Sequence, residues 1–223
     1  MNVLVFGAAG MVGQAVLREC LLDAGVAVVT AVGRTPLLQS SIRKQIEHGD
    51  MFDLSSIASR LRGHDACFFC LGMSSVGMTE PNYRRLTHDL TLAVAGSLAL
   101  GNPAMSFSYV SGAGTDSSEA GESMWARIKG KTENDLLQAG FSRVFLFRPG
   151  VIQPLHGVRT KSHLYRLVYA VLGPLISLAK RLLPRHIVTS EELGRAMLAT
   201  ARHLQASAVL EVEDIVMWDK SHS

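Results

Sequence analysis

Three glycines near the start of the chain, Gly7, Gly10 and Gly13, most strongly constrain what it can fold into. They follow an apolar run at residues 3–6 and precede apolar residues at helical spacing, which predicts a buried strand, a tight turn and a helix. A turn without side chains lets backbone approach a pyrophosphate, and the free N–H groups at a helix start favour negative charge. The stretch therefore predicts a dinucleotide-binding turn, with a purely structural strand-to-helix turn as the alternative.

The turn itself supplies the first set of expected cofactor contacts. These are the backbone positions Gly7, Ala9, Gly10, Met11, Val12 and Gly13.

The rest of the chain alternates strand-like and helix-like segments. Further strands are expected at residues 26–32, 42–47, 65–71, 105–111, 143–148 and 209–216. Helices are expected at residues 55–61, 79–100, 122–138 and 189–203, the last opened by a capping box at Thr189 and Glu192. This alternation predicts an α/β fold of Rossmann type, a doubly wound parallel sheet of six or seven strands with helices on both faces. A length of 223 residues suits one NAD(P)-binding domain over residues 1–223, with a substrate-side or lid segment at about 155–190.

The end of the second expected strand bears on cofactor choice. NAD-binding folds usually place an acidic residue there to bind the ribose hydroxyls, but this chain has Gly33 and Arg34. A guanidinium suits a 2′-phosphate, so NADP(H) is favoured over NAD(H), unless Arg34 is only an exposed loop residue. By topology, Asp50 and Met51 are expected beside the adenine. Leu71 and Gly72 are expected near the cofactor ribose.

Positive charge is concentrated in the second half of the chain. Residues 136–190 hold eight Lys and Arg but no Asp or Glu. Such asymmetry attracts an anion, such as a cofactor phosphate, an acidic substrate or a membrane surface, unless it is merely a solvated face. Nucleic acid is not expected, because no aromatic interleaving or recognition-helix pattern accompanies the charge.

The apolar segment at residues 164–183 has three interpretations. Its uncharged run is too short to span a bilayer. We favour a substrate lid or pocket wall. Core packing or a homodimer face, and docking on a membrane surface, are the alternatives.

Cysteine and histidine usage points away from a metal. Cys67 and Cys70 fall three apart in an apparent strand, which sends their side chains to opposite faces. The histidines show no zinc-ligand spacing, so no metal is expected. The first residues lack the basic and apolar segments of a secretory signal, so we expect a cytoplasmic protein.

Several further motifs occur in order along the chain and complete a family pattern. They are the glycine turn, Gly33-Arg34, Gly49-Asp50, the strand end at Tyr109 to Ser111, the helix with Lys129 and Glu133, and Arg148-Pro149-Gly150. Over about residues 1–155 the chain resembles the atypical short-chain dehydrogenase/reductase superfamily, and within it the NmrA-like and Tat-interacting oxidoreductase-like NAD(P)-binding proteins, often described as epimerases. The resemblance implies that Ser111 hydrogen-bonds a substrate carbonyl and that Lys129 holds the nicotinamide ribose. It also implies that Pro149 and Gly150 lie by the nicotinamide carboxamide.

One position departs from the family pattern. The superfamily places a tyrosine four residues before the lysine, but here Trp125 precedes Lys129. An indole N–H is a donor only and cannot shuttle a proton as a phenol does. Tyr83 is the replacement that we retain as a catalytic candidate; the others considered are Tyr109, Asp116, Glu119 and Glu122.

Two functional hypotheses follow. The first is an NADP-dependent reductase or epimerase that acts on a small, anionic or apolar carbonyl compound. In it Ser111 polarises the carbonyl, Lys129 fixes the ribose and the proton donor is unassigned. The second is an NADP(H)-bound sensor or interaction protein without turnover, which Trp125 favours.

Overall fold

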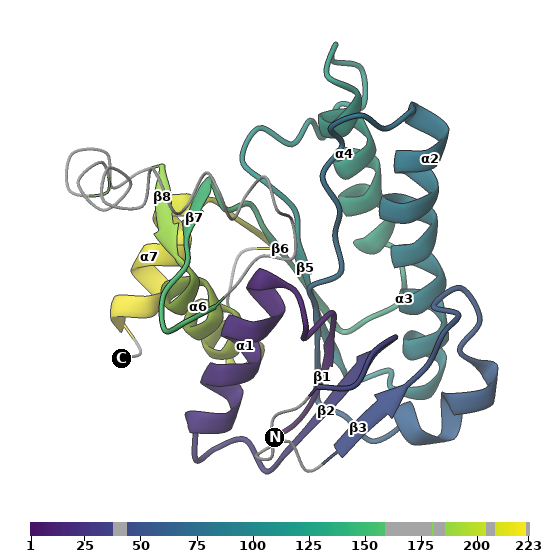
Figure 1. Cartoon of the computed structure of the whole chain (residues 1–223), viewed down its shortest axis with the longest axis vertical. Helices are drawn as coiled ribbons and strands as arrows, with labels where there is room; N and C mark the ends of the chain where they lie inside the picture. Colours follow the sequence, from purple (N-terminus) through teal and green to yellow (C-terminus); the bar gives the residue numbers. More distant parts are fainter. Residues whose placement is uncertain (38–43, 159–179, 181–185, 204–207, 222–223) are drawn as a thin grey trace.

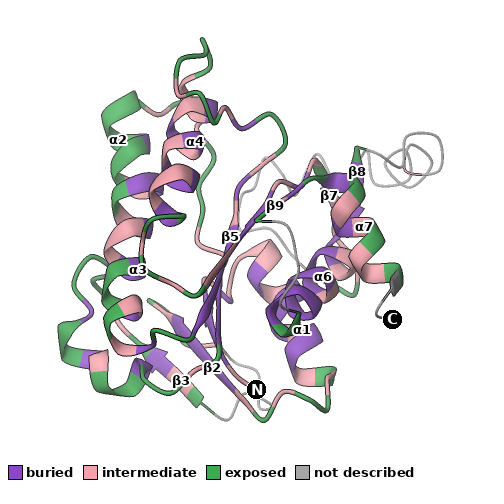
Figure 2. Ribbon diagram, turned by 180° about the vertical axis from the view of Figure 1, so that it is seen from behind, coloured by how far each residue is buried: buried purple, intermediate pink, exposed green. Residues whose placement is uncertain are grey.

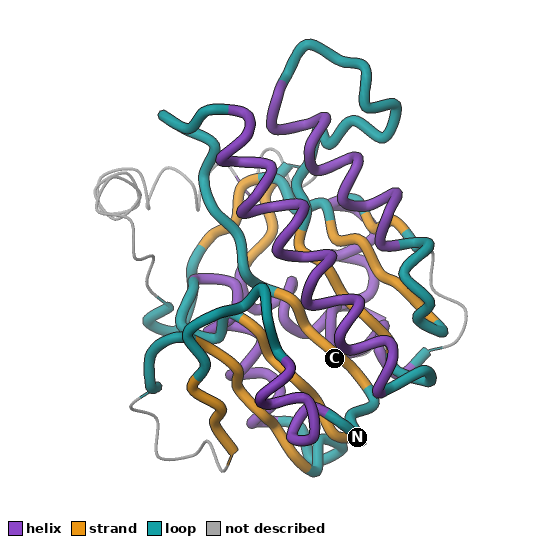
Figure 3. Tube along the Cα trace, turned by 90° about the vertical axis from the view of Figure 1, so that its right-hand side faces the viewer, coloured by secondary structure: helices purple, strands orange, loops and turns teal. Residues whose placement is uncertain are grey.

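The computed structural model describes residues 1–37, 44–158, 180, 186–203 and 208–221. A parallel sheet of seven strands forms its centre, in the order β3-β2-β1-β4-β5-β6-β9 (Figure 3). The strands are β1 (Asn2–Phe6), β2 (Val28–Gly33), β3 (Lys44–Glu47), β4 (Ala66–Phe69), β5 (Ser106–Val110), β6 (Arg143–Phe147) and β9 (Val209–Leu210). The order reverses direction between β1 and β4, which is where an open α/β sheet binds ligands. This confirms the predicted Rossmann-type fold.

Helices cover both faces of the sheet (Figure 1). On one face lie α1 (Met11–Leu22), α6 (Ser190–Arg202) and α7 (Val212–Ser221); on the other lie α2 (Glu80–Arg84), α3 (Leu90–Gly101) and α4 (Met124–Leu136). The central strands β1, β4 and β5 are almost wholly buried (Figure 2), as expected for a sheet covered on both sides, whereas the edge strand β3 is partly exposed. Cys67 packs in the α3 and α4 layer and Cys70 against the α1 and α6 layer, which confirms that they face opposite sides.

The capping box forms as predicted. Thr189 Oγ1 accepts a hydrogen bond of 3.0 Å from the Glu192 N–H, and Glu192 Oε2 accepts one of 2.7 Å from the Thr189 N–H. The helix α6 that follows crosses α1 closely, with Gly194 at the crossing beside the Ala15 carbonyl. A side chain at position 194 would push the two helices apart.

Other predicted elements differ from the structure. Residues 55–61 form a 3₁₀ helix (Ser55–Leu61) rather than an α-helix, and the predicted helix at 79–100 is divided into α2, a π-helical turn (Arg85–Asp89) and α3. Thr79 precedes α2 without a side-chain cap hydrogen bond. At the π-helical turn, His88 Nε2 lies 2.7 Å from Asp135 Oδ2 of α4, so a tertiary contact joins the irregular turn to its neighbour.

The predicted last strand at residues 209–216 is wrong beyond its first two residues. Only Val209–Leu210 joins the sheet, and α7 starts at Val212. Asp214 Oδ2 accepts a hydrogen bond of 2.9 Å from the Glu211 N–H, and Val212 and Ile215 are buried at helical spacing. A short stretch of mixed apolar and acidic residues does not distinguish these periods, and the burial of Val212 and Ile215 in the core with α1 and α6 accompanies the helix.

A second, two-stranded parallel sheet was not predicted. It pairs β7 (Val151–Gln153) with β8 (Ile187–Thr189) and so brackets the expected substrate-side segment. The apolar interval at 164–183 lies outside the described residues, except for Lys180, which forms an ion pair with Glu192. Within the described ranges, no helix combines the length and apolar character needed to cross a bilayer.

Candidate functional site

The glycine turn joins β1 to α1 and brings backbone from two strands together. Gly7 has a φ of +78°, and a Cβ there would lie 2.9 Å from the Cys70 carbonyl at the end of β4. A Cβ at Gly13 would overlap the Gly7 carbonyl oxygen. Gly7 and Gly13 are therefore required by close backbone approach.

Gly10 is the N-cap of α1, and no side chain caps the helix there. Its own N–H donates to the Gly7 carbonyl at 2.9 Å, which closes the turn. The positive end of α1 thus opens onto the carboxyl edge of the sheet, where it favours an anion.

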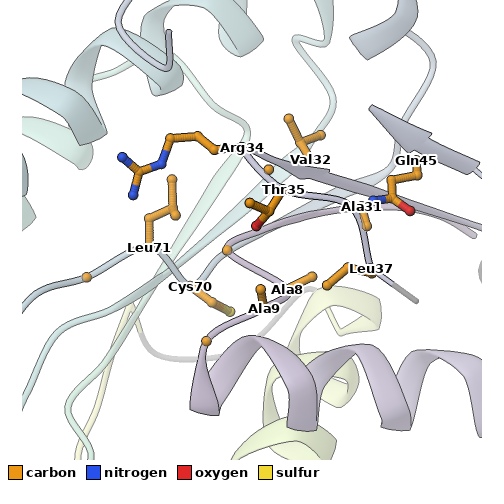
Figure 4. A pocket seen from close by; sticks show the side chains of 14 residues that line it. Ala8, Ala9, Ala31, Val32, Arg34, Thr35, Leu37, Gln45, Cys70 and Leu71 are labelled. Carbon is orange, nitrogen blue, oxygen red and sulfur yellow. The ribbon is translucent and has the colours of Figure 1, made fainter. Parts of the chain in front are cut away.

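A cleft of about 380 Å³ lies above this turn, between the ends of β1, β2 and β4 (Figure 4). Six of the predicted cofactor residues line it: Gly7, Ala9, Gly10, Arg34, Leu71 and Gly72. The residues that sequence reasoning missed are Ala8, Ala31, Val32, Gly33, Thr35, Leu37, Gln45 and Cys70. Most of these adjoin a predicted residue in sequence, whereas Gln45 lies mid-strand and its place in the cleft depends on the pairing of β3 with β2.

The other predicted cofactor residues do not line this cleft. Met51 is buried in the core with Leu54 and Ile57, and Asp50 accepts a hydrogen bond from the Phe52 N–H at 2.9 Å. Met11, Val12 and Gly13 form the first turn of α1. Lys129 lies on α4, beside the end of β5, and Pro149 and Gly150 follow β6.

Arg34 is the only ionisable side chain, apart from the Cys70 thiol, among the described residues that line the cleft. It is exposed and extends from the end of β2 (Figure 4). Because no carboxylate lines the described wall, the cleft is electrostatically suited to an anion.

The second half of the site lies at the ends of β5 and β6. The Lys129 ammonium of α4 donates to the Ser111 carbonyl at 2.7 Å and to the Val110 carbonyl at 3.4 Å. Burial lowers the pKa of Lys129 to about 8, and the charge of Glu133 only partly opposes this. Ser111 and Lys129 are therefore brought together, as the family pattern implies.

The Ser111 side chain belongs to a small hydroxyl network. Its Oγ lies 2.9 Å from Thr115 Oγ1, which donates to the Gly112 carbonyl at 2.7 Å. Trp125, half-buried on α4, lies over this turn, since its ring carbons are the nearest atoms to a Cβ built at Gly112 or Gly114.

Three of the candidate proton donors, Tyr83, Tyr109 and Asp116, lie in shielded or hydrogen-bonded positions. Tyr83 is 1% and Tyr109 2% exposed, and burial raises the pKa of both phenols. Asp116 accepts hydrogen bonds from Ser118 and Gly121, which lower its carboxyl pKa. None of these three side chains presents an open proton donor in this structure.

Arg148 and Glu133, which the sequence analysis named only as parts of the family pattern, form an ion pair between β6 and α4. Arg148 at the end of β6 binds the buried Glu133 of α4 at 2.5 to 3.2 Å through two nitrogens, and its other contacts are Ser117 at 2.6 Å and Glu211 at 3.1 Å. Beside it, the Pro149 carbonyl accepts a hydrogen bond of 2.9 Å from the Ala113 N–H. The pair fixes the helix of Lys129 against the connection after β6 that contains Pro149 and Gly150. No group of three or more potential metal ligands occurs within the described ranges.

Comparison with known proteins places this geometry in a family. No protein-family model matches the chain. Protein FMP52, mitochondrial, of Eremothecium gossypii is 31% identical over 218 residues, which cover 96% of this chain and 94% of the relative. Protein HTATIP2 of Rattus norvegicus is 28% identical over 156 residues, 68% of this chain; the match spans 62% of that relative, less than two thirds of its length.

Solved structures show the same fold at lower identity. MoeE5 in complex with UDP-glucose and NAD superposes with a TM-score of 0.69 at 19% identity, covering 99% of this chain and 81% of that one. A short chain dehydrogenase family protein from Francisella tularensis gives 0.63 at 16% identity, over 94% and 95% of the two chains. With the glycine turn, Ser111 and Lys129 in place, the chain belongs to the atypical short-chain dehydrogenase/reductase superfamily, alongside the FMP52 and HTATIP2 proteins.

Proposed function

We propose that this protein binds NADP(H), with the pyrophosphate over the Gly7 to Gly13 turn and the 2′-phosphate at Arg34. The observation that carries the proposal is the cleft itself, a backbone cradle at a helix N-terminus whose described wall offers Arg34 and no carboxylate. The residues present fit the cofactor, because a Cβ at Gly7 or Gly13 would fill the space that the close backbone approach needs. NAD, which MoeE5 holds in its solved complex, is the competing cofactor.

The chemistry that such a cofactor supplies is hydride transfer, so the proposed activity is that of a reductase or epimerase on a small carbonyl compound and its alcohol counterpart. Ser111 contacts the reacting oxygen and Lys129 binds the nicotinamide ribose. The half-buried Lys129 ammonium now held by backbone carbonyls would exchange one of them for a ribose hydroxyl. Pro149 and Gly150 complete the nicotinamide side. Trp125 replaces the usual tyrosine and fills its place without serving as an acid or base.

A non-catalytic NADP(H) sensor is the second candidate, favoured by one observation. The described tyrosines nearest the site, Tyr83 and Tyr109, are both shielded from solvent, and Trp125 cannot replace a phenol chemically. Under this hypothesis the cofactor is bound and no turnover follows.

Calorimetry and a turnover assay distinguish these proposals. Micromolar binding of NADPH, together with NADPH oxidation by some member of a broad panel of carbonyl compounds, supports the enzyme. Micromolar binding without oxidation supports the sensor. Absence of binding by either NADPH or NADH would refute both.

The proposal also concerns the class of substrate and the location of the protein in the cell. A small-molecule substrate, anionic or apolar, suits the basic composition of residues 136–190, and the complex of MoeE5 with UDP-glucose supports this proposal. The cytoplasmic location and the homodimer remain predictions. The FMP52 relative is named mitochondrial, so fractionation of the source cells into cytosol and mitochondria is the direct test of location.

A further inference from the structure

The hydroxyl network around Ser111 determines which way its proton points. Residues 112–115 form a tight turn in which Gly114 has a φ of +84° and the Gly112 carbonyl accepts from the Thr115 N–H at 3.1 Å. The same carbonyl lies 2.7 Å from Thr115 Oγ1. A carbonyl oxygen can only accept a hydrogen bond, so the single hydroxyl proton of Thr115 is donated to the Gly112 carbonyl.

The contact between Thr115 and Ser111 then has only one polarity. Their oxygens lie 2.9 Å apart, and Thr115 has no second proton, so Ser111 donates and Thr115 accepts. The reverse arrangement would leave two unprotonated oxygens facing each other across the 2.7 Å contact with Gly112. The Ser111 hydroxyl therefore donates its proton to Thr115 and has none to donate to a ligand.

The position of Ser111 is held on both sides of its backbone. Its N–H donates to the Phe147 carbonyl of β6 at 2.7 Å, and its carbonyl accepts from Lys129 of α4 at 2.7 Å. The turn that carries Thr115 is held in turn by the Ala113 hydrogen bond to Pro149 and by the ring of Trp125. These contacts fix the backbone of Ser111 and the backbone of the turn that carries Thr115 relative to β6 and α4.

We propose that Thr115 is a positioning residue that makes Ser111 a hydrogen-bond acceptor, so that the site binds a substrate through a hydroxyl group in preference to a carbonyl. A carbonyl oxygen has lone pairs only and would face those of Ser111, whereas an alcohol can donate to them. The inference rests on the proposed function for the identity of the site. It changes the role of Ser111 from polarising a carbonyl to receiving the proton of an alcohol.

Neutron diffraction from crystals of the full, cofactor-free chain grown in D₂O tests the orientation directly. We expect deuterium on Ser111 Oγ directed at Thr115, and deuterium on Thr115 Oγ1 directed at the Gly112 carbonyl. Deuterium on Thr115 directed at Ser111 would overturn the proposal. This readout needs no bound nucleotide, so its failure is separate from a failure to bind NADPH.

A matched ligand pair tests the consequence for binding. Cyclohexanol is titrated into NADPH-loaded protein and cyclohexanone into NADP⁺-loaded protein, so that neither reacts. Thr115→Val should lower the ratio of alcohol to ketone affinity by about tenfold, because Ser111 regains a proton to donate, while Thr115→Ser keeps the wild-type ratio. An unchanged ratio in a folded Thr115→Val variant, or no binding of the alcohol to wild type, contradicts the substrate preference. If Thr115→Val does not fold, the neutron result decides the orientation.

Discussion

The two ends of the candidate site differ in which atoms form them, backbone atoms at the glycine turn and side-chain atoms around Ser111 and Lys129. The proposed cofactor end is made of backbone: a positive φ at Gly7, an overlap that excludes a side chain at Gly13, and a cleft with Arg34 as its described cation. The proposed catalytic end is made of side chains, with Ser111, Thr115, Trp125 and Lys129 held by hydrogen bonds and packing. Backbone geometry tolerates no substitution, whereas a side-chain site can lose one group and keep the rest. On the proposed function, this difference allows the glycine turn to be kept while Trp125 stands where the family pattern has a tyrosine.

The largest effect is expected for a substitution of Gly13 in the glycine turn. Gly13→Ala places a Cβ against the Gly7 carbonyl and displaces the turn or α1, so NADPH affinity should fall by about a thousandfold, roughly 4 kcal/mol, in calorimetry. Gly49→Ala is the matched control, because its Cβ would meet nothing within 4 Å. A folded Gly13→Ala variant with wild-type affinity would show that the close approach is not needed for binding.

Burial of Lys129 at the proposed catalytic end makes the stability of the protein depend on pH. The pKa of Lys129 is lowered from 10.5 to about 8 by burial, so between these values the unfolded chain binds more protons and stability rises with pH. Lys129→Met should therefore be more stable than wild type at pH 7, by on the order of 3 kcal/mol, and this advantage should disappear as pH rises from 8 to 10.5. Denaturant unfolding at several pH values measures it. A difference independent of pH would assign the effect to packing instead.

Replacing Trp125 with tyrosine tests whether a phenol at this position supports turnover. If the protein is an enzyme limited by its proton donor, Trp125→Tyr should raise NADPH oxidation by about a hundredfold with NADPH affinity unchanged. Trp125→Phe is the control, since it supplies a ring without a hydroxyl. Equal rates for the two variants would exclude the missing phenol as the cause of low turnover.

The smallest expected effect lies at Arg34. Arg34→Ala should weaken NADPH by about ten- to thirtyfold and NADH by less than about twofold, because only NADPH carries the 2′-phosphate. Arg62→Ala, after the 3₁₀ helix and outside the cleft, should change neither. Equal losses for both nucleotides would mean that Arg34 does not recognise the phosphate.

Much of the fold was predictable because it depends on local patterns. The glycine turn, the apolar strands and the Thr189 capping box each have a short-range signal, and the structure confirms them. Residues 209–216 were not predictable, because two residues of pairing with β6 and a helix starting at Val212 share one short stretch of mixed apolar and acidic residues. The strands β7 and β8 are three residues each and are defined only by each other.

The sequence by itself predicted the glycine turn, the alternation of strands and helices through most of the chain, and Trp125 at the position where the family pattern has a tyrosine, because each of these is a property of neighbouring residues. Only the tertiary structure decided that Gln45 lines the cleft, that Met51 is in the core, and that Tyr83 is shielded. It also decided that Thr115 Oγ1 lies 2.7 Å from the Gly112 carbonyl and 2.9 Å from Ser111 Oγ, the two contacts on which the proposed orientation of the Ser111 hydroxyl rests. Hydrogen-bond direction and burial depend on groups brought together from distant segments, and no spacing along the chain records them.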